Sequence, residues 1–248
     1  MIEGIQVIDF HAHAGQADAS GWKDDPDLML RTMDAAGIDR ACLFHIFYPD
    51  GTTSNDLTAR LVARHPDRFI GFAYVSPLMP ERMLPELRRA IDTLKFAAIK
   101  LYPPYTVWKD VGEAAWHPIY QFADERGLAV IIHTDETVLP GHLAAVAPCY
   151  PRAKFVAAHS GNTPIPRAQA ITVARRHPNV YLETCSTFRT PGVIEQLVDG
   201  AGADRVLFGS DMPLLDPRPQ LGKIITTQIP PEAKRKILSE NARALLRI

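Results

Sequence analysis

The sequence has few cysteines and almost no net charge. Only three cysteines, Cys42, Cys149 and Cys185, occur in 248 residues, and their spacing matches no metal-binding motif. An odd number without regular spacing argues against a disulfide-rich secreted domain and favours reduced thiols in the cytoplasm. Proteins that bind nucleic acids or membrane surfaces usually carry an excess of basic residues. The net charge of this chain is −1, so we expect neither as a partner.

Long hydrophobic runs are absent too. A transmembrane helix needs about 20 apolar residues, and no segment reaches that length. The N-terminal residues lack the basic and apolar stretches of a signal peptide, so we expect a cytoplasmic protein. No linker or low-complexity segment interrupts the chain, in which 46% of residues are apolar and 22% are charged. We therefore expect one domain over residues 1–248, a size typical of a single barrel.

Short apolar runs alternate with longer amphipathic segments along the whole chain. The runs predict eight strands, at Ile5–Phe10, Arg40–His45, Phe69–Val75, Ala97–Leu101, Leu128–His133, Lys154–His159, Val180–Thr184 and Arg205–Gly209. Helical patterns fill the intervals, and the tail from Pro230 to Ile248 is expected to form one or two short closing helices. Strands that alternate with helices predict a parallel sheet, and eight such repeats predict a (β/α)8 TIM barrel.

Polar side chains follow several of these apolar strands at their C-terminal ends. His11 and His13 are two residues apart, so a strand would point both imidazoles the same way, toward one divalent ion. The ends of four further strands carry Lys100, His133, His159 and Asp211. Buried polar groups cost free energy unless they are partnered, and the chemistry of TIM barrels lies at this end of the strands. We therefore expect all six side chains to converge on one site.

The order of these residues resembles the amidohydrolase superfamily of metal-dependent barrel enzymes. Three segments carry the resemblance: Ile8-Asp9-Phe10-His11-Ala12-His13, Ile99-Lys100-Leu101-Tyr102-Pro103 and Phe208-Gly209-Ser210-Asp211-Met212-Pro213. They are similar to the branch known as amidohydrolase-2, which includes the aminocarboxymuconate-semialdehyde decarboxylase group. The resemblance extends over the whole chain and implies a scaffold and a metal chemistry, but no particular substrate.

The resemblance also implies a role for each residue of the site. His11, His13, His133 and Asp211 would hold one divalent ion, which we expect to be zinc, and would leave a position open for water. Zinc lowers the pKa of such a water to about 7, and Asp211 could accept its proton. His159 would hydrogen-bond the water, or would bind a second ion if one is present. We favour one ion over two.

Lys100 has three alternative roles. In relatives with two ions, a lysine at the end of strand four forms a carbamate with carbon dioxide and bridges the ions. In relatives with one ion, a lysine here would anchor a substrate carboxylate by its charge. The remaining alternative is an ion pair in the barrel mouth. We favour the anchor.

The loops after the strands are rich in aromatic residues. His45 ends strand two, and Glu183 and Cys185 end strand seven, so all three are candidates to face the mouth of the barrel. The aromatic residues and cations of these loops are Trp22, Phe47, Tyr48, Tyr102, Tyr105, Trp108, Phe188, Lys109 and Arg189. Such a mouth suits a small organic acid, lactone or ring compound. The sequence leaves open whether the chain forms a homodimer.

Three functions are compatible with this site. Our main prediction is a metal-dependent hydrolase of a small amide, ester or lactone, because most of the superfamily hydrolyses its substrates. The alternative is a nonoxidative decarboxylase or a hydratase on the same metal site, since both also need a polarising ion and an acid–base pair. The third is a noncatalytic binding or assembly protein. We disfavour it because every position of the motif carries its functional residue.

Overall fold

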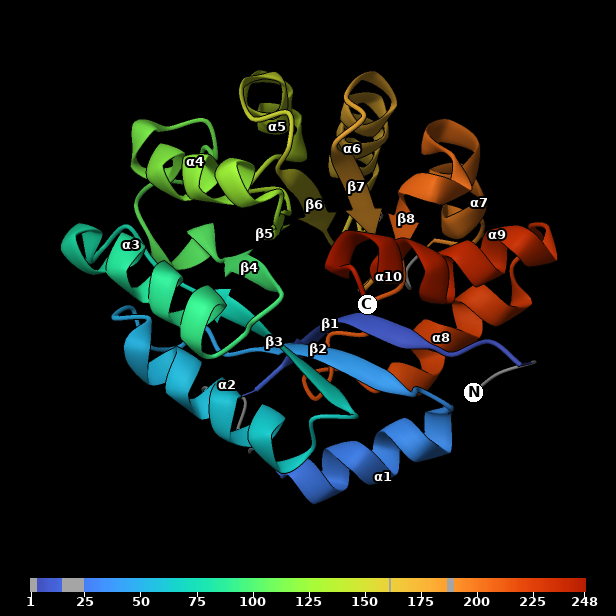
Figure 1. Ribbon diagram of the computed structural model, residues 1–248. Coiled ribbons are helices and arrows are strands. Elements are labelled where there is room, and N and C mark those ends of the chain that lie inside the picture. The colour runs from blue at the N-terminus through green and yellow to red at the C-terminus, as the bar shows by residue number, and fades with distance from the viewer. Residues whose placement is uncertain (1–3, 15–24, 161, 187–189) are drawn as a thin grey trace.

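Eight parallel strands form the core of the computed structural model, which describes residues 4–14, 25–160, 162–186 and 190–248. Each strand pairs with the next along the chain, in the order β1 to β8 (Figure 1). Their bounds are β1 Ile8–His13, β2 Arg40–Phe44, β3 Phe69–Tyr74, β4 Ala98–Leu101, β5 Ala129–His133, β6 Lys154–Ala158, β7 Val180–Glu183 and β8 Val206–Leu207.

Helices surround the strands and complete the predicted TIM barrel (Figure 1). They are α1 Pro26–Ala36, α2 Thr52–Arg64, α3 Pro80–Arg88, α4 His117–Arg126, α5 Leu143–Val146, α6 Pro164–Arg176, α7 Val193–Ala201, α8 Pro217–Thr226, α9 Pro231–Arg235 and α10 Asn241–Leu246. Both the (β/α)8 architecture and the C-terminal helices are therefore confirmed.

Backbone hydrogen bonds between β1 and the segment after β8 close the barrel. The amide of Phe10 donates to the carbonyl of Phe208 at 2.9 Å, and the amide of Asp211 donates to the carbonyl of His11 at 2.8 Å. A third bond joins the amide of His13 to the carbonyl of Met212 at 2.7 Å. The last strand segment is thereby held directly beside the first, although about 200 residues separate them.

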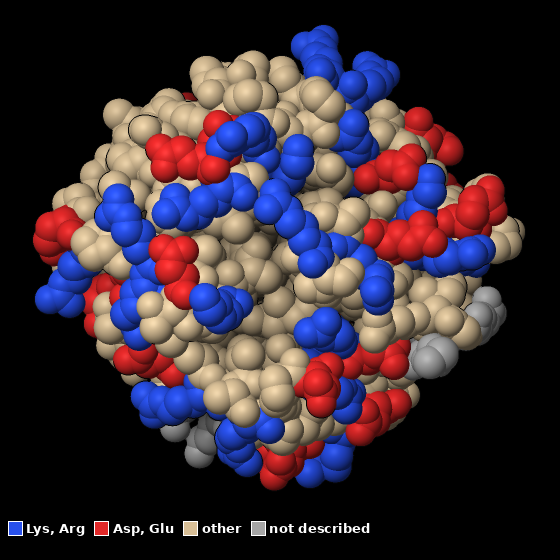
Figure 2. Space-filling view, in the orientation of Figure 1, with Lys and Arg blue, Asp and Glu red and all other residues tan. Residues whose placement is uncertain are grey.

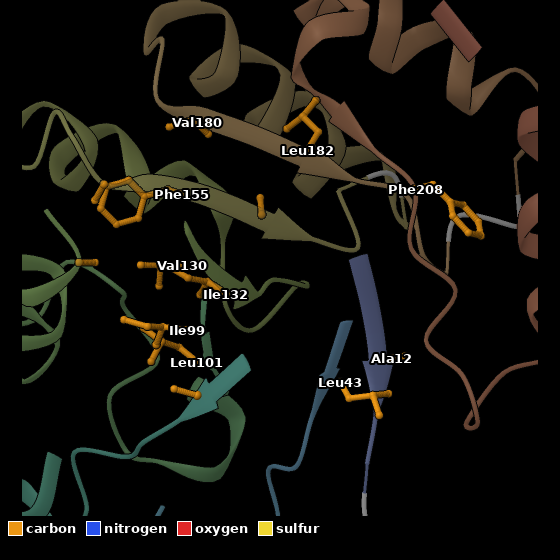
Figure 3. Close-up of a cluster of buried hydrophobic side chains, with 14 of the residues drawn as sticks. Ala12, Leu43, Ile99, Leu101, Val130, Ile132, Phe155, Val180, Leu182 and Phe208 are labelled. Atoms are coloured by element: carbon orange, nitrogen blue, oxygen red, sulfur yellow. The ribbon is translucent and has the colours of Figure 1, made fainter. Parts of the chain in front are cut away.

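The outward-facing side chains of the strands form the layer that holds the helices. Figure 3 shows this cluster, in which successive strands each contribute buried apolar residues. Its labelled members are Ala12, Leu43, Ile99, Leu101, Val130, Ile132, Phe155, Val180, Leu182 and Phe208. Because strand side chains alternate, the residues between these must face the barrel interior.

The barrel interior contains a second apolar cluster that is closed at one end by α10. Strand residues such as Phe10, Phe72 and Ile131 lie in this cluster together with Leu245 and Leu246 of α10. The closing helix therefore covers the interior from one side. The polar residues at the C-terminal ends of the strands remain at the other end of the barrel.

β1 begins and ends three residues later than predicted. The apolar run starts at Ile5, but β1 spans Ile8–His13, because both histidines remain in the ladder and His13 pairs with Phe44 of β2. The register of this pair shifts between Asp9 and Ala12. Apolar character therefore did not predict the C-terminal end of β1, because pairing with β2 extends the strand to the polar residue His13.

The surface carries charges of both signs. Basic and acidic side chains are interspersed over the face shown in Figure 2, in line with the net charge of −1. No described helix combines the length and the apolar character that a membrane span requires.

Gly71 in β3 offers a test of the packing between this strand and the segment that leads into β4. A Cβ at this position would lie 2.3 Å from the ring of Phe96, whereas a Cβ at Gly222 in α8 would meet no atom within 4 Å. We expect Gly71→Ala to lower the free energy of unfolding by about 1–3 kcal/mol through overpacking. Gly222→Ala, the matched control, should leave it unchanged or raise it by up to about 1 kcal/mol. Urea unfolding measures both, and equal stabilities would refute the tight contact.

Candidate metal centre

Three side chains, two from β1 and one from the segment after β8, have their ligand atoms close together. Asp211 Oδ1 lies 2.9 Å from His13 Nε2 and 3.3 Å from His11 Nε2. All three residues are buried, and their ligand atoms lie close enough together to hold one metal ion. Two imidazoles and one carboxylate form a donor set that suits a divalent transition metal. The closure of the barrel thus assembles three of the four predicted ligands.

Charge and burial act in opposite directions on Asp211. Burial alone would favour the neutral carboxyl, but the neighbouring imidazoles of His11 and His13 hold its pKa well below its usual range. Burial lowers the pKa of His11 well below its ordinary value. An ionised carboxylate beside an unprotonated imidazole is the state in which these groups bind a metal.

The backbone turns two of the site residues inward at the strand ends. His159 has a φ of 59° and Asp211 a φ of 67°, so both occupy the left-handed region that few residues other than glycine adopt. His159 directly follows β6, which ends at Ala158 rather than at His159 as predicted. Such conformations cost about 1–3 kcal/mol and are concentrated at functional sites. Simple strand alternation would not have placed these two side chains.

His133, the fourth predicted ligand, lies beside the other three without joining their cluster. Its Nδ1 is 3.1 Å from His159 Nε2, and its Nε2 is 3.0 Å from Asp135 Oδ2. Burial lowers the pKa of His133, and its hydrogen bond lowers the pKa of Asp135 below the usual range. Asp135 was not predicted as a site residue, although its position two residues after the candidate ligand His133 could have indicated the contact.

Glu183 fixes the orientation of the His11 ring through a hydrogen bond to its Nδ1 atom. Its Oε2 lies 3.0 Å from His11 Nδ1, and its carboxylate also accepts the backbone N–H groups of Cys185 and His159. A histidine that donates one ring nitrogen to a carboxylate presents the other nitrogen to a metal. Gly209 makes room for this contact, because a Cβ there would lie 2.0 Å from Glu183 Oε1. The sequence placed Glu183 at a strand end but did not predict this role.

Asp9 is another buried carboxyl group whose role was not predicted from the sequence. It accepts the backbone N–H groups of His11 and Ser210, each at 3.0 Å, and also the hydroxyl of Ser210. Burial raises the pKa of Asp9 to about 7. The side chain thus ties β1 to the segment that carries Asp211. A carboxylate within an otherwise apolar run was the available signal.

Lys100 lies inside the barrel, deep in the same cluster. Its Nζ is 3.3 Å from His11 Nε2 and 4.5 Å from the centre of the Phe44 ring. The side chain is completely buried, and burial lowers its pKa to about 8. A lysine with this pKa is mostly charged near neutral pH, as a cationic anchor requires, and has a smaller neutral fraction, which carbamate formation requires.

A small pocket opens over the polar cluster. It has a volume of about 80 Å³, and its lining includes Phe47, Tyr102 and Tyr105 along with His133, His159 and Asp211. The Tyr102 ring lies 4.5 Å from that of Tyr105 and 4.7 Å from that of His133, measured between ring centres. Aromatic side chains and candidate ligands therefore line the same pocket, with Tyr102 directly beside His133.

The other predicted mouth residues lie elsewhere. Tyr48 stacks on His45 at 5.3 Å, and Trp108 packs against the apolar layer outside the barrel. Lys109 donates to the carbonyls of Pro103 and Pro104, at 3.2 and 2.6 Å. Its charge is thus directed at its own loop. Three further predictions lie outside the described residues: Trp22, Phe188 and Arg189.

The comparison with family models identifies the lineage of the chain. The amidohydrolase model matches residues 8–248. The chain belongs to the amidohydrolase family. The resemblance inferred from the sequence motifs is confirmed.

The relatives of the chain include decarboxylases and a hydratase. A gamma-resorcylate decarboxylase of Polaromonas sp. is 24% identical over 254 residues, which cover 79% of this chain and 75% of the relative. Among solved structures, a dihydroxybenzoic acid decarboxylase of Polaromonas sp. with bound manganese is 20% identical and superimposes with a TM-score of 0.77, covering 98% and 97% of the two chains. A 4-oxalomesaconate hydratase of Rhodopseudomonas palustris is 22% identical, with a TM-score of 0.76 and coverage of 98% and 96%.

These relatives correct one prediction and leave another unconfirmed. The prediction of a hydrolase is wrong, because the relatives described above are decarboxylases and a hydratase, which are lyases and not hydrolases. The prediction relied on the reaction that most of the superfamily catalyses, but the same scaffold and metal site can serve several reactions. A divalent metal is supported by the family and by the ligand cluster. Zinc in particular is unconfirmed, because one relative holds manganese.

The ligand cluster predicts the metal content of the protein. Protein purified without chelator should carry about one tightly held divalent ion per chain, and His13→Ala should lose most of it because one of the converging donors is removed. His142→Ala, which changes a partly exposed histidine paired with Asp110, is the matched control and should keep its ion. Elemental analysis measures all three proteins. Equal metal content in His13→Ala and the wild type would contradict this site.

Proposed function

We propose that this protein is a metal-dependent, nonoxidative decarboxylase of a small aromatic carboxylic acid. The observation that carries the proposal is a pocket whose lining combines an aromatic wall, formed by Phe47, Tyr102 and Tyr105, with the candidate metal ligands His13, His133 and Asp211. A flat ring fits against such a wall while its carboxylate faces the ligands. The decarboxylase activities of the relatives, on resorcylate and dihydroxybenzoate, support the proposal.

The proposed ion site consists of His11, His13, His133 and Asp211. His133 borders the same pocket as His13 and Asp211, and to act as a ligand it would give up one of its bonds to His159 or Asp135. A divalent ion held there would bind the substrate's oxygen atoms and offset their negative charge. We propose one ion per chain.

The reaction itself requires a proton at the ring carbon that bears the carboxylate. That carbon gains the proton, the bond to the carboxylate breaks, and its electron pair returns to the ring as carbon dioxide leaves. His159 and Asp211 both border the pocket, and we propose that they carry this proton. The aromatic wall limits the water around the reacting carbon.

Lys100 is proposed as the cationic anchor. Its Nζ lies on the same side of His11 as Asp211, since both contact His11 Nε2 at 3.3 Å. A charge at this depth would add to that of the ion and stabilise a bound carboxylate. A carbamate on Lys100 is the competing role.

The activity is tested with the manganese-loaded protein and a panel of benzoates that carry a hydroxyl beside the carboxylate. The reaction is run in heavy water and followed by NMR. We expect the carboxylate to be replaced by deuterium at the same ring carbon, because solvent supplies the proton. If none of the panel reacts but an unsaturated dicarboxylic acid gains water, the protein is a hydratase and the proposal fails.

Asp211→Asn keeps the shape of the side chain but removes its charge and its ability to accept a proton. We expect turnover to fall by about 10²-fold or more, with an unchanged circular dichroism spectrum. Asp199→Asn on the exposed face of α7 is the control and should retain full activity. Near-normal turnover in Asp211→Asn would exclude this residue from the reaction.

Lys100→Met separates the two proposed roles of the lysine. As an anchor, the lysine contributes ground-state binding, so the variant should keep its metal and raise KM for the acid by about tenfold or more. Lys100→Arg should restore part of this binding, because a guanidinium keeps the charge but forms no carbamate. Metal analysis and steady-state kinetics measure both effects. Loss of metal in both variants would favour the carbamate instead.

A further inference from the structure

The two ring nitrogens of His11 face two different groups of ligand atoms. Nε2 faces Asp211 Oδ1 at 3.3 Å, within the cluster already described. Nδ1 faces the opposite way, toward Glu183 Oε2 at 3.0 Å and Cys185 Sγ at 3.3 Å. Glu183 and Cys185 are completely buried, and neither takes part in the proposed reaction.

Cys185 is the centre of this second group. Its Sγ lies 3.0 Å from His159 Nδ1 and 3.0 Å from Glu183 Oε2, in addition to the contact with His11. The ligand atoms of His11, His159 and Cys185 are close enough together to hold one ion. In a tetrahedral zinc site, ligand atoms are separated by about 3.4–3.7 Å. The contacts of Sγ, at 3.0–3.3 Å, would therefore have to widen by roughly half an ångström.

We propose that Cys185, His159 and the Nδ1 atom of His11, with Glu183 as an oxygen ligand, form a second cation site for a thiophilic divalent ion. Sulfur ligands select zinc or cadmium, whereas manganese prefers oxygen and imidazole donors. The outer set of His11, His13 and Asp211 contains no sulfur. The two sets thus differ in the class of ion that they prefer.

The two sites exclude each other because they share His11. A neutral imidazole has one unprotonated nitrogen and can serve one ion at a time. An ion in the inner site releases one proton to solvent, from the Cys185 thiol, while the single ring proton of His11 moves from Nδ1 to Nε2. His11 then carries its proton on Nε2, which faces Asp211 and no longer offers a lone pair to the outer site. A thiophilic ion therefore displaces the catalytic ion.

Charge also distinguishes the sites. A divalent ion with the Cys185 thiolate and the Glu183 carboxylate is neutral overall, whereas in the outer set it meets the single carboxylate of Asp211. Only the outer ion retains a positive charge for an acidic substrate. His159 borders both the pocket and the inner group, so an ion can reach the inner site past this side chain.

The test uses cadmium and the full-length metal-free protein. Cys149→Ser serves as the parent, because Cys149 is an exposed thiol that would bind cadmium on its own. We expect the ultraviolet charge-transfer absorbance of a cadmium thiolate to saturate at about one ion per chain. Cys185→Ser in this parent should abolish it and weaken cadmium binding by about 10- to 100-fold or more. Cys42→Ser, the matched control for a buried thiol, should retain the absorbance.

A second readout tests the exclusion between the sites. Cadmium added to the manganese-loaded parent should release free manganese, measured by electron paramagnetic resonance, with the thiolate absorbance rising in parallel. His159→Ala provides a second variant in case Cys185→Ser does not fold, and it should also weaken the absorbance. No absorbance in the parent, or undiminished absorbance in Cys185→Ser, would overturn the inner site. Simultaneous retention of both ions would overturn the exclusion.

The experiment involves no substrate. A failure of the decarboxylation assay therefore leaves this inference intact, and a failure here leaves the proposed function intact.

Discussion

The closure of the barrel between β1 and the segment after β8 is the constraint on which the site depends. The hydrogen bond from the Asp211 amide to the His11 carbonyl brings the last candidate ligand to the first two. Asp9 strengthens the same junction from inside by accepting N–H groups from both segments. A rigid frame of this kind is what a metal centre requires, because ligand geometry is lost with shifts of a fraction of an ångström.

The site concentrates buried polar groups that are stable only as a set. His11, Lys100 and Glu183 are completely buried, and each lies within hydrogen-bond distance of another member. An unpartnered group of this kind would cost several kcal/mol, roughly the margin by which a domain is stable. The cluster therefore has to be assembled together, and the left-handed backbone of His159 and Asp211 is part of its cost.

The reaction is a separate question from the scaffold. The same ligands can activate water or hold a carboxylate, so the motif led to a metal centre but to the wrong reaction class. In the proposed function, the alternatives are distinguished by the aromatic lining of the pocket, which is formed by Phe47, Tyr102 and Tyr105. Function in this fold is thus decided by the loops, whereas the strand ends supply the common chemistry.

The sequence by itself determined the barrel, the family and the identity of the polar strand ends, because these depend on local periodicity and on motifs within single strands. It missed the roles of Asp9 and Glu183, since their partners Ser210 and His11 lie far away along the chain. It also missed Asp135, although its partner His133 is only two residues away. It also could not show that His133 is held by His159 and Asp135, or that Cys185 lies against His11. Only the tertiary structure decides such contacts, because residues up to about 200 positions apart become neighbours when the barrel closes.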